Sequence, residues 1–97
     1  MAEPEIVVTR DSLISRSADL MSADLDQDTV LMSLERGSYF ALAETGRAIW
    51  QQLAAPMRAA DLCASLCALY EGPAGRIEAD TLAFLSRLAQ LGLIDVR

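Results

Sequence analysis

The sequence predicts an α+β domain in which a three-stranded antiparallel sheet is followed by three helices. Up to Leu42 the apolar residues form short runs separated by polar breaks of hairpin length. After Leu42 they recur every three to four residues, which is the period of a helix. Pro56, Gly72-Pro73 and Gly92 then divide this second half into three segments of helical length.

Residues 1–19 are predicted to form a mobile arm or an edge strand that precedes a domain at residues 20–97. Ile6-Val7-Val8-Thr9 has the β-branched composition of a short strand. The rest of this segment is polar, with only Leu13 and Ile14 to bury.

Three strands are predicted next, and they share β-branched, apolar or aromatic composition. They are Leu20–Leu25, Thr29–Leu34 and Ser38–Leu42. The breaks between them, Asp26-Gln27-Asp28 and Glu35-Arg36-Gly37, are short enough for hairpin turns. Gly37 can adopt the left-handed conformation that such turns need, so the three strands should form a meander.

Three helices are predicted after the meander, each ended by proline or glycine. They run from about Glu44 to Ala54, Ala59 to Tyr70 and Arg76 to Leu91, and a short tail, Leu93–Val96, follows. The second and third helices have the proportions of a helix-turn-helix in a winged-helix-like arrangement. That shape does not by itself define a function.

Composition weighs against several functions. Fourteen acidic residues against eight basic ones give a net charge of −6, which repels phosphate backbones and anionic lipids. There is no histidine to act as a general base near neutral pH. No glycine-rich phosphate loop, nucleophile elbow or metal-ligand spacing occurs. We therefore expect no enzyme activity, no cofactor, no nucleic acid and no membrane partner.

The two cysteines and the N-terminus suggest a cytoplasmic protein. Cys63 and Cys67 leave a zinc or iron–sulfur site short of ligands, so we expect buried, reduced thiols. The first residues do not resemble a secretory signal, and no apolar run approaches the length of a membrane span.

The third predicted strand is expected to leave part of its surface without a partner. Tyr39 and Phe40 are adjacent, so they point to opposite faces, and helices on one face can bury only one of them. The N-terminal arm could cover the other aromatic ring. Unless residues 5–9 pair with this strand, one row of its N–H and C=O groups faces outward. An open edge also permits a homodimer or arm exchange.

The third predicted helix carries an apolar arc of about 180°, wider than the stripe a surface helix usually needs. Phe84 and Leu91 lie at the rim of this arc, beside Asp80 and Arg87. A deeply buried helix explains such an arc equally well. Beside an open strand edge, however, the arc predicts a groove that holds an extended peptide by main-chain pairing and selects its side chains through apolar pockets.

The run Val30–Trp50 resembles the PqqD family, and Asp80–Leu88 with Gly92-Leu93-Ile94 resembles the closing helix of that family. The shared features are the turn glycine Gly37, Tyr39-Phe40, Leu42, Thr45-Gly46 and Ile49-Trp50. The resemblance covers residues 20–96. It departs from the family at Ala43, where asparagine is usual, and at Arg58, where threonine or serine is frequent, and each change loses an N-cap worth about 1 kcal/mol.

The resemblance implies a RiPP recognition element, a non-catalytic domain that binds the leader segment of a ribosomally made precursor peptide. In that family the leader adds as a strand to the third strand and lies against the third helix. Partners implied are the leader peptide and a tailoring enzyme such as a radical SAM enzyme, a leader peptidase or a cyclase. The long arm is atypical of the pyrroloquinoline quinone branch, so a lasso peptide or other pathway is at least as well supported.

The residues expected to bind the peptide lie on the third strand and the third helix. They are Gly37, Ser38, Tyr39, Phe40, Ala41, Leu42, Asp80, Phe84, Arg87 and Leu91. The strand supplies main-chain hydrogen bonds, and Tyr39 is expected to be the outward aromatic that lines the groove. Phe84 and Leu91 form an apolar pocket, and Asp80 and Arg87 read charges on the peptide.

Two other functions are considered beside peptide binding, and only the first excludes it. A winged-helix DNA-binding regulator would use the third helix, but its exposed line offers only Arg87 as a cation, beside Asp80 and Glu78. A specific DNA binder makes about six to ten phosphate contacts. A structural subunit that docks on a larger enzyme is compatible with leader binding.

Overall fold

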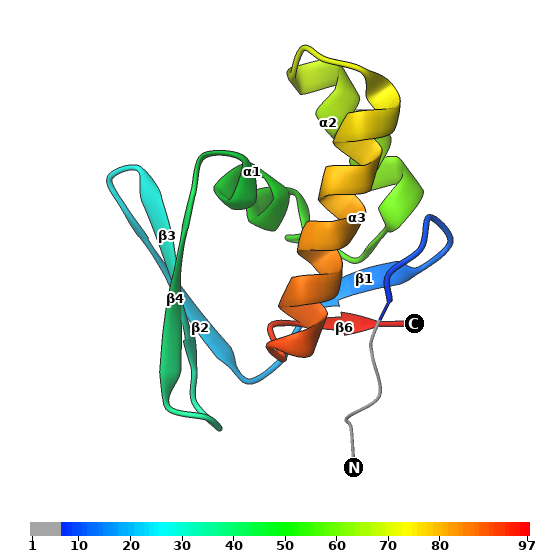
Figure 1. The fold of residues 1–97 in the computed structure, drawn as a ribbon. Helices are drawn as coiled ribbons and strands as arrows, with labels where there is room; N and C mark the ends of the chain where they lie inside the picture. Colours follow the sequence, from blue (N-terminus) through cyan, green and yellow to red (C-terminus); the bar gives the residue numbers. More distant parts are fainter. Residues whose placement is uncertain (1–6) are drawn as a thin grey trace.

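The computed structural model describes residues 7–97, which form two small antiparallel sheets and three helices (Figure 1). The strands are β1 (Leu13–Arg16), β2 (Leu20–Leu25), β3 (Asp28–Ser33), β4 (Ser38–Ala43), β5 (Met57–Arg58) and β6 (Ile94–Val96). The helices are α1 (Glu44–Gln52), α2 (Ala59–Leu69) and α3 (Ala74–Gln90). The α+β class, the meander and the three helices are therefore confirmed, with element ends shifted by two residues or fewer.

The predicted meander is the sheet β2-β3-β4. Its first turn is tight, because Leu25 pairs with Asp28 and leaves only two residues between the strands. Its second turn ends at Gly37, where φ is +67°, a conformation that glycine adopts without the steric cost paid by other residues. The two turns align the three strands along their full length.

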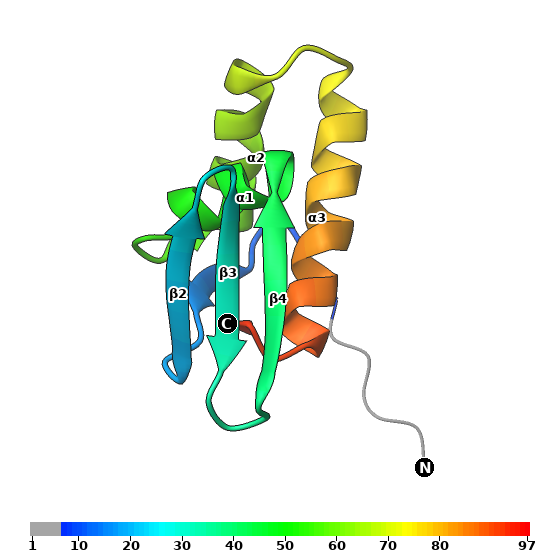
Figure 2. The ribbon, with the colours of Figure 1, turned by 90° about the vertical axis from the view of Figure 1, so that its left-hand side faces the viewer.

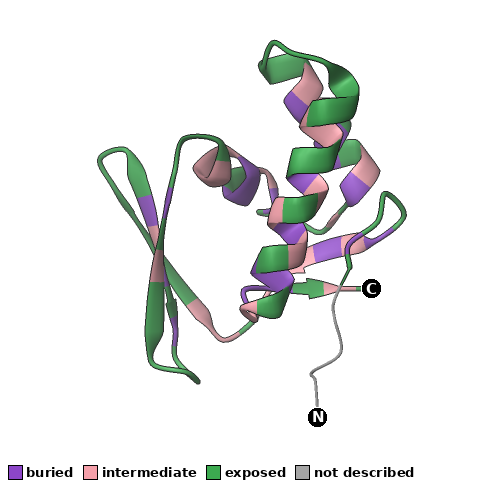
Figure 3. Cartoon of the chain, in the orientation of Figure 1, coloured by how far each residue is buried: buried purple, intermediate pink, exposed green. Residues whose placement is uncertain are grey.

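All three helices lie on one side of the meander, so its two faces differ (Figures 1 and 2). On the inner face Leu31 and Leu42 belong to the core. On the outer face Met21, Met32 and Tyr39 form one cross-strand row. Their relative exposures are 58%, 40% and 72%, so nothing in residues 7–97 covers this row, and Figure 3 shows most of β2 and β4 as exposed.

The helices supply most of the core. Ile49 and Trp50 of α1, Leu62 and Leu66 of α2, and Leu85 and Leu88 of α3 are all buried. The chain leaves α3 through Gly92, which has φ +77° and turns the backbone toward β6.

The second sheet has the order β5-β1-β6 and changes the interpretation of the N-terminal segment. We predicted a mobile arm or an edge strand, but β1 is the central strand of this sheet and Ile14 is fully buried. The predicted tail provides its partner β6. Of the strand predicted at residues 6–9, residue 6 lies outside the described part, and residues 7–9 are not in a strand.

Arg16 connects this sheet to α1. Its guanidinium lies 4.6 Å from the centroid of the Trp50 ring and also donates a hydrogen bond to the Trp50 carbonyl. Burial lowers the pKa of Arg16, while the charge of Asp24 opposes this shift. The strand missed from the sequence is thus fixed to the core by a cation–π contact and a hydrogen bond.

The two cysteines are free thiols, with Cys63 buried and Cys67 half-buried. Burial raises the pKa of the Cys63 thiol, and the nearby charge of Glu78 adds to this shift. Within residues 7–97, none of the helices has both the length and the apolar character needed to cross a membrane.

Candidate functional site: the groove between β4 and α3

β4 forms the edge of the meander. Within residues 7–97 it pairs with β3 on one side and with no strand on the other. The sequence left open that residues 5–9 pair with this strand. Of these, residues 7–9 do not pair with β4, and the Val8 N–H instead donates a hydrogen bond to Ser86 Oγ on α3. The edge of β4 that faces α3 is therefore open to an added strand (Figure 2).

The register indicates which main-chain groups face this open edge. In a two-residue hairpin the residues that flank the turn form a hydrogen-bonded pair, and here these residues are Leu25 and Asp28. Along antiparallel strands such pairs alternate with pairs that are not hydrogen-bonded to each other. Residues 28, 30 and 32 of β3 then bond to β2, and residues 29, 31 and 33 bond to β4. Consequently, the N–H and C=O groups of Tyr39 and Ala41 point outward.

A hollow of about 240 Å³ runs between β4 and α3. It is lined by Phe40, Ala41, Leu42, Phe84, Arg87, Leu88, Leu91 and Leu93. Seven of these eight residues are apolar, and Arg87 is the only charged one. An extended chain on the open edge of β4 would lie over this hollow and place side chains in it.

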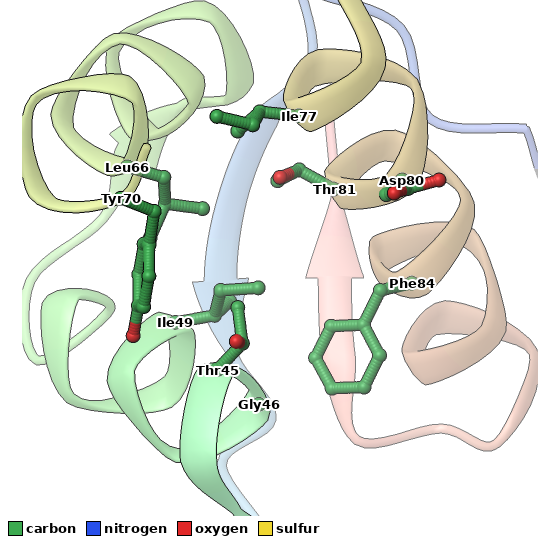
Figure 4. Close-up of a pocket in the computed structure, with 9 residues that line it drawn as sticks. All are labelled: Thr45, Gly46, Ile49, Leu66, Tyr70, Ile77, Asp80, Thr81 and Phe84. Atoms are coloured by element: carbon green, nitrogen blue, oxygen red, sulfur yellow. The ribbon is translucent and has the colours of Figure 1, made fainter. Parts of the chain in front are cut away.

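A second hollow of about 330 Å³ lies between the three helices (Figure 4). It is lined by Thr45, Gly46, Ile49, Leu66, Tyr70, Ile77, Asp80, Thr81 and Phe84. Its polar groups are three hydroxyls and the carboxylate of Asp80. We did not predict this hollow, because residues from three helices meet there and no local pattern indicates their proximity.

Phe84 lines both hollows, and its ring lies against Gly46 (Figure 4). A Cβ at position 46 would lie only 3.2 Å from Phe84 Cζ. The absence of a side chain at Gly46 therefore makes room for the ring that separates the two hollows. This contact gives a physical reason for the glycine of the Thr45-Gly46 pair noted in the sequence.

The structure brings most of the predicted site residues together. Phe40, Ala41, Leu42, Phe84, Arg87 and Leu91 line the smaller hollow, and Asp80 lines the larger one. Gly37 ends the turn and Ser38 begins β4, and neither residue lines a hollow. Two lining residues were not among the predicted set: Leu88, which was visible in the apolar arc of the helix, and Leu93, which belongs to the tail.

The prediction that Tyr39 lines the groove needs correction. Tyr39 pairs with the exposed Met32 and lies on the outer face, whereas Phe40 pairs with the buried Leu31 and lines the hollow. The alternation of side chains was predicted correctly. The choice between the two rings failed because the helices leave Phe40 half-buried at the margin of the sheet, where it serves both the core and the groove.

An open strand edge beside an apolar helix is the architecture of modules that bind an extended chain by strand addition. Residues 28–94 match the family described as coenzyme PQQ synthesis protein D (PqqD). The chain belongs to the PqqD family.

Two solved structures are similar to this chain. One is TbiB1 in complex with the TbiA(beta) leader peptide, at 32% identity and a TM-score of 0.78, covering 84% of this chain and 94% of that one. The other is lasso peptide synthetase B1 complexed with the leader peptide, at 26% identity and a TM-score of 0.75, covering 84% and 96%. A search of curated proteins found no match.

Proposed function

We propose that this protein binds the leader region of a ribosomally synthesised precursor peptide and presents the precursor to modifying enzymes. The observation that carries the proposal is the open edge of β4 beside the apolar groove on α3. Membership of the PqqD family supports it. So does the presence of a leader peptide in both similar solved structures.

The leader adds to β4 as a fourth strand. Each main-chain hydrogen bond contributes a net of about 0.5–1.5 kcal/mol, so pairing with Tyr39 and Ala41 gives affinity that depends little on sequence. Alternate side chains of the leader point toward α3 and enter the hollows on either side of Phe84. The hollows therefore provide selectivity, and the strand edge provides the common attachment.

The protein itself acts as a carrier and leaves the chemistry to a partner. A leader held as a strand fixes one end of the precursor and leaves the remainder free to enter the active site of another enzyme. We assign the protein to a lasso-type pathway in the cytoplasm, where its partner is a tailoring enzyme such as a leader peptidase, a cyclase or a radical SAM enzyme.

The decisive experiment tests the strand edge directly. The probe is the TbiA(beta) leader peptide, labelled with fluorescein and followed by fluorescence anisotropy. Ala41→Pro removes an outward N–H from β4, and proline is tolerated on edge strands. We expect its leader affinity to fall at least about tenfold, a loss of about 1.4 kcal/mol, with a nearly unchanged circular dichroism spectrum.

The matched control is Ser22→Pro, on β2 at the opposite edge of the same sheet. By the same alternation Ser22 also has an N–H that points away from the sheet, so each variant loses one N–H that makes no hydrogen bond within the sheet. We expect Ser22→Pro to bind within about twofold of the unmodified protein. Equal affinities for the two variants, both folded, would exclude β4 as the attachment edge.

DNA binding is not favoured. On α3 the cations Arg76 and Arg87 are accompanied by Glu78 and Asp80, and Arg76 lies 3.9 Å from Asp80. With a net charge of −6 the whole chain adds repulsion. A mobility-shift assay with duplex DNA at low salt should show no complex under conditions where the leader is bound.

A further inference from the structure

The two hollows carry opposite charges. Among residues 7–97, Asp80 is the only charged residue that lines the larger hollow, and Arg87 is the only one that lines the smaller hollow. Both belong to α3, and Phe84 lies between them. A bound strand would therefore pass a carboxylate at one end, an aromatic ring in the middle and a guanidinium at the other end.

Both charges are accessible to a guest peptide. Asp80 lies 3.9 Å from Arg76, but the two side chains are 77% and 80% exposed, so this pair contributes little and a guest cation can compete with it. Within residues 7–97 no carboxylate lies within salt-bridge distance of Arg87.

Arg36 adds a second cation at the Arg87 end. A Cβ built on Gly92 would lie 3.2 Å from Arg36 Nη2, so this guanidinium packs against the residue that follows Leu91. Leu91 lines the smaller hollow. Arg36 therefore strengthens the positive potential at the end of the groove that Arg87 already defines.

The order of the lining residues sets the direction of a guest strand. From Phe40 to Gly46 the chain passes from the smaller hollow to the larger one, whereas α3 passes from the larger hollow to the smaller one between Asp80 and Leu91. Every pair in the two described sheets is antiparallel. A guest that continues this pattern on β4 runs in the same direction as α3, so its N-terminal part lies near Asp80.

The helix geometry sets the spacing. Asp80 and Arg87 are seven positions apart, or about 10 Å along the helix axis at 1.5 Å per residue. Side chains on one face of a strand repeat about every 6.6 Å, so positions two and four residues apart span about 7 Å and 13 Å. With a spacing of four residues, the guest side chain midway between the two charges lies over Phe84. The long side chain of Arg87 bridges the difference between about 10 Å along the helix and about 13 Å along the strand.

We propose that the groove selects leader segments in which a basic residue precedes an acidic residue by four positions, with an apolar residue midway between them. The basic residue pairs with Asp80, the apolar one contacts Phe84, and the acidic one pairs with Arg87. This inference rests on the proposed leader binding. It adds a charge order that fixes both the direction and the register of the bound strand.

The experiment uses the TbiA(beta) leader peptide as the host for a charge scan. A lysine and an aspartate four positions apart are introduced in both orders, and the pair is moved along the leader one residue at a time. Dissociation constants are measured by fluorescence anisotropy at low and high salt. A second set with three-residue spacing, which turns the two charges to opposite faces of the strand, is the peptide control.

At one register we expect the lysine-first peptide to bind roughly three- to tenfold more tightly than the aspartate-first peptide, because the two exposed ion pairs contribute about two- to threefold each. The ratio should shrink toward one at high salt, where charges are screened. It should also shrink in Asp80→Asn and Arg87→Gln and reverse in the double variant Asp80→Lys/Arg87→Glu. The matched control variants, Asp61→Asn and Arg97→Gln, remove exposed charges that line neither hollow and should keep the ratio.

The outcomes separate this inference from the function on which it rests. If the host leader binds but the two charge orders bind equally at every register, the groove does not read charge and the inference is wrong, while leader binding stands. A preference for the aspartate-first order overturns the proposed direction. If no peptide in the set binds, both the inference and the proposed function are overturned.

Discussion

At the scale of single residues, the shape of the site depends on the position of the Phe84 ring. Phe84 occupies the boundary between the two hollows because Gly46 offers no side chain in its place. The ring is half-buried, so it also contributes to the packing of α1 against α3. The effect of Phe84 on leader binding can be distinguished from its effect on packing by measuring affinity and stability on the same variant.

Phe84→Ala should weaken binding of the TbiA(beta) leader about tenfold or more, because it merges the two hollows and removes the apolar contact between them. The circular dichroism spectrum should remain nearly unchanged, with a loss of unfolding free energy of about 1–3 kcal/mol. Leu82→Ala is the matched control, since Leu82 is half-buried on α3 but lines neither hollow. Unchanged affinity in a folded Phe84→Ala protein would place the pocket elsewhere.

At the scale of elements, α1 begins without a side-chain cap. Its N-cap residue, Ala43, makes no side-chain hydrogen bond to the first turn, and the next residue, Glu44, has φ +52°. The junction between β4 and α1 therefore lacks a stabilising contact that a short polar side chain supplies in many helices. This junction leads directly from the strand edge to the larger hollow.

Ala43→Asn should raise the free energy of unfolding by about 1 kcal/mol, because its side-chain oxygen can accept a hydrogen bond from an N–H of the first turn. The measurement is urea unfolding followed by circular dichroism. Ala54→Asn, an exposed position just after α1, is the control and should leave stability within about 0.5 kcal/mol of the original. No gain at position 43 would mean that the strained Glu44 prevents the capping geometry.

The second sheet gives a further test at this scale. Ile14 is fully buried at the centre of β1, so Ile14→Ala should cost about 2–5 kcal/mol of unfolding free energy. Val7→Ala, at an exposed apolar position in the same N-terminal segment, should cost less than about 0.5 kcal/mol. Equal and small effects would restore the interpretation of this segment as a detached arm.

The elements that local sequence determines were the ones that could be predicted. The meander and helices follow from turn residues and from the spacing of apolar residues within each segment, and the pairing of β4 with α3 across a groove followed from their unused surface. The sheet β5-β1-β6 could not be predicted in this way, because its strands have two to four residues and come from three distant parts of the chain. The larger hollow was missed for the same reason.

At the scale of the whole molecule, the groove is formed by several segments that are far apart in the sequence. β4 supplies the edge, α3 supplies most of the lining, and the turn carrying Arg36 approaches the end of α3 at Gly92. Because the core joins these parts, a loss of core packing should affect leader affinity through the position of α3 relative to β4. Substitutions of the half-buried Phe84 or the exposed Arg87, which line the groove outside the buried core, should instead leave the fold intact.

The exposed row of Met21, Met32 and Tyr39 becomes part of a larger surface when a leader strand pairs with the edge of β4. Every second residue of that strand would be displayed on the same plane as these three side chains. An enzyme that docks on this outer face would contact this protein and its bound leader at the same interface. It could thereby distinguish the leader-bound protein from the free protein.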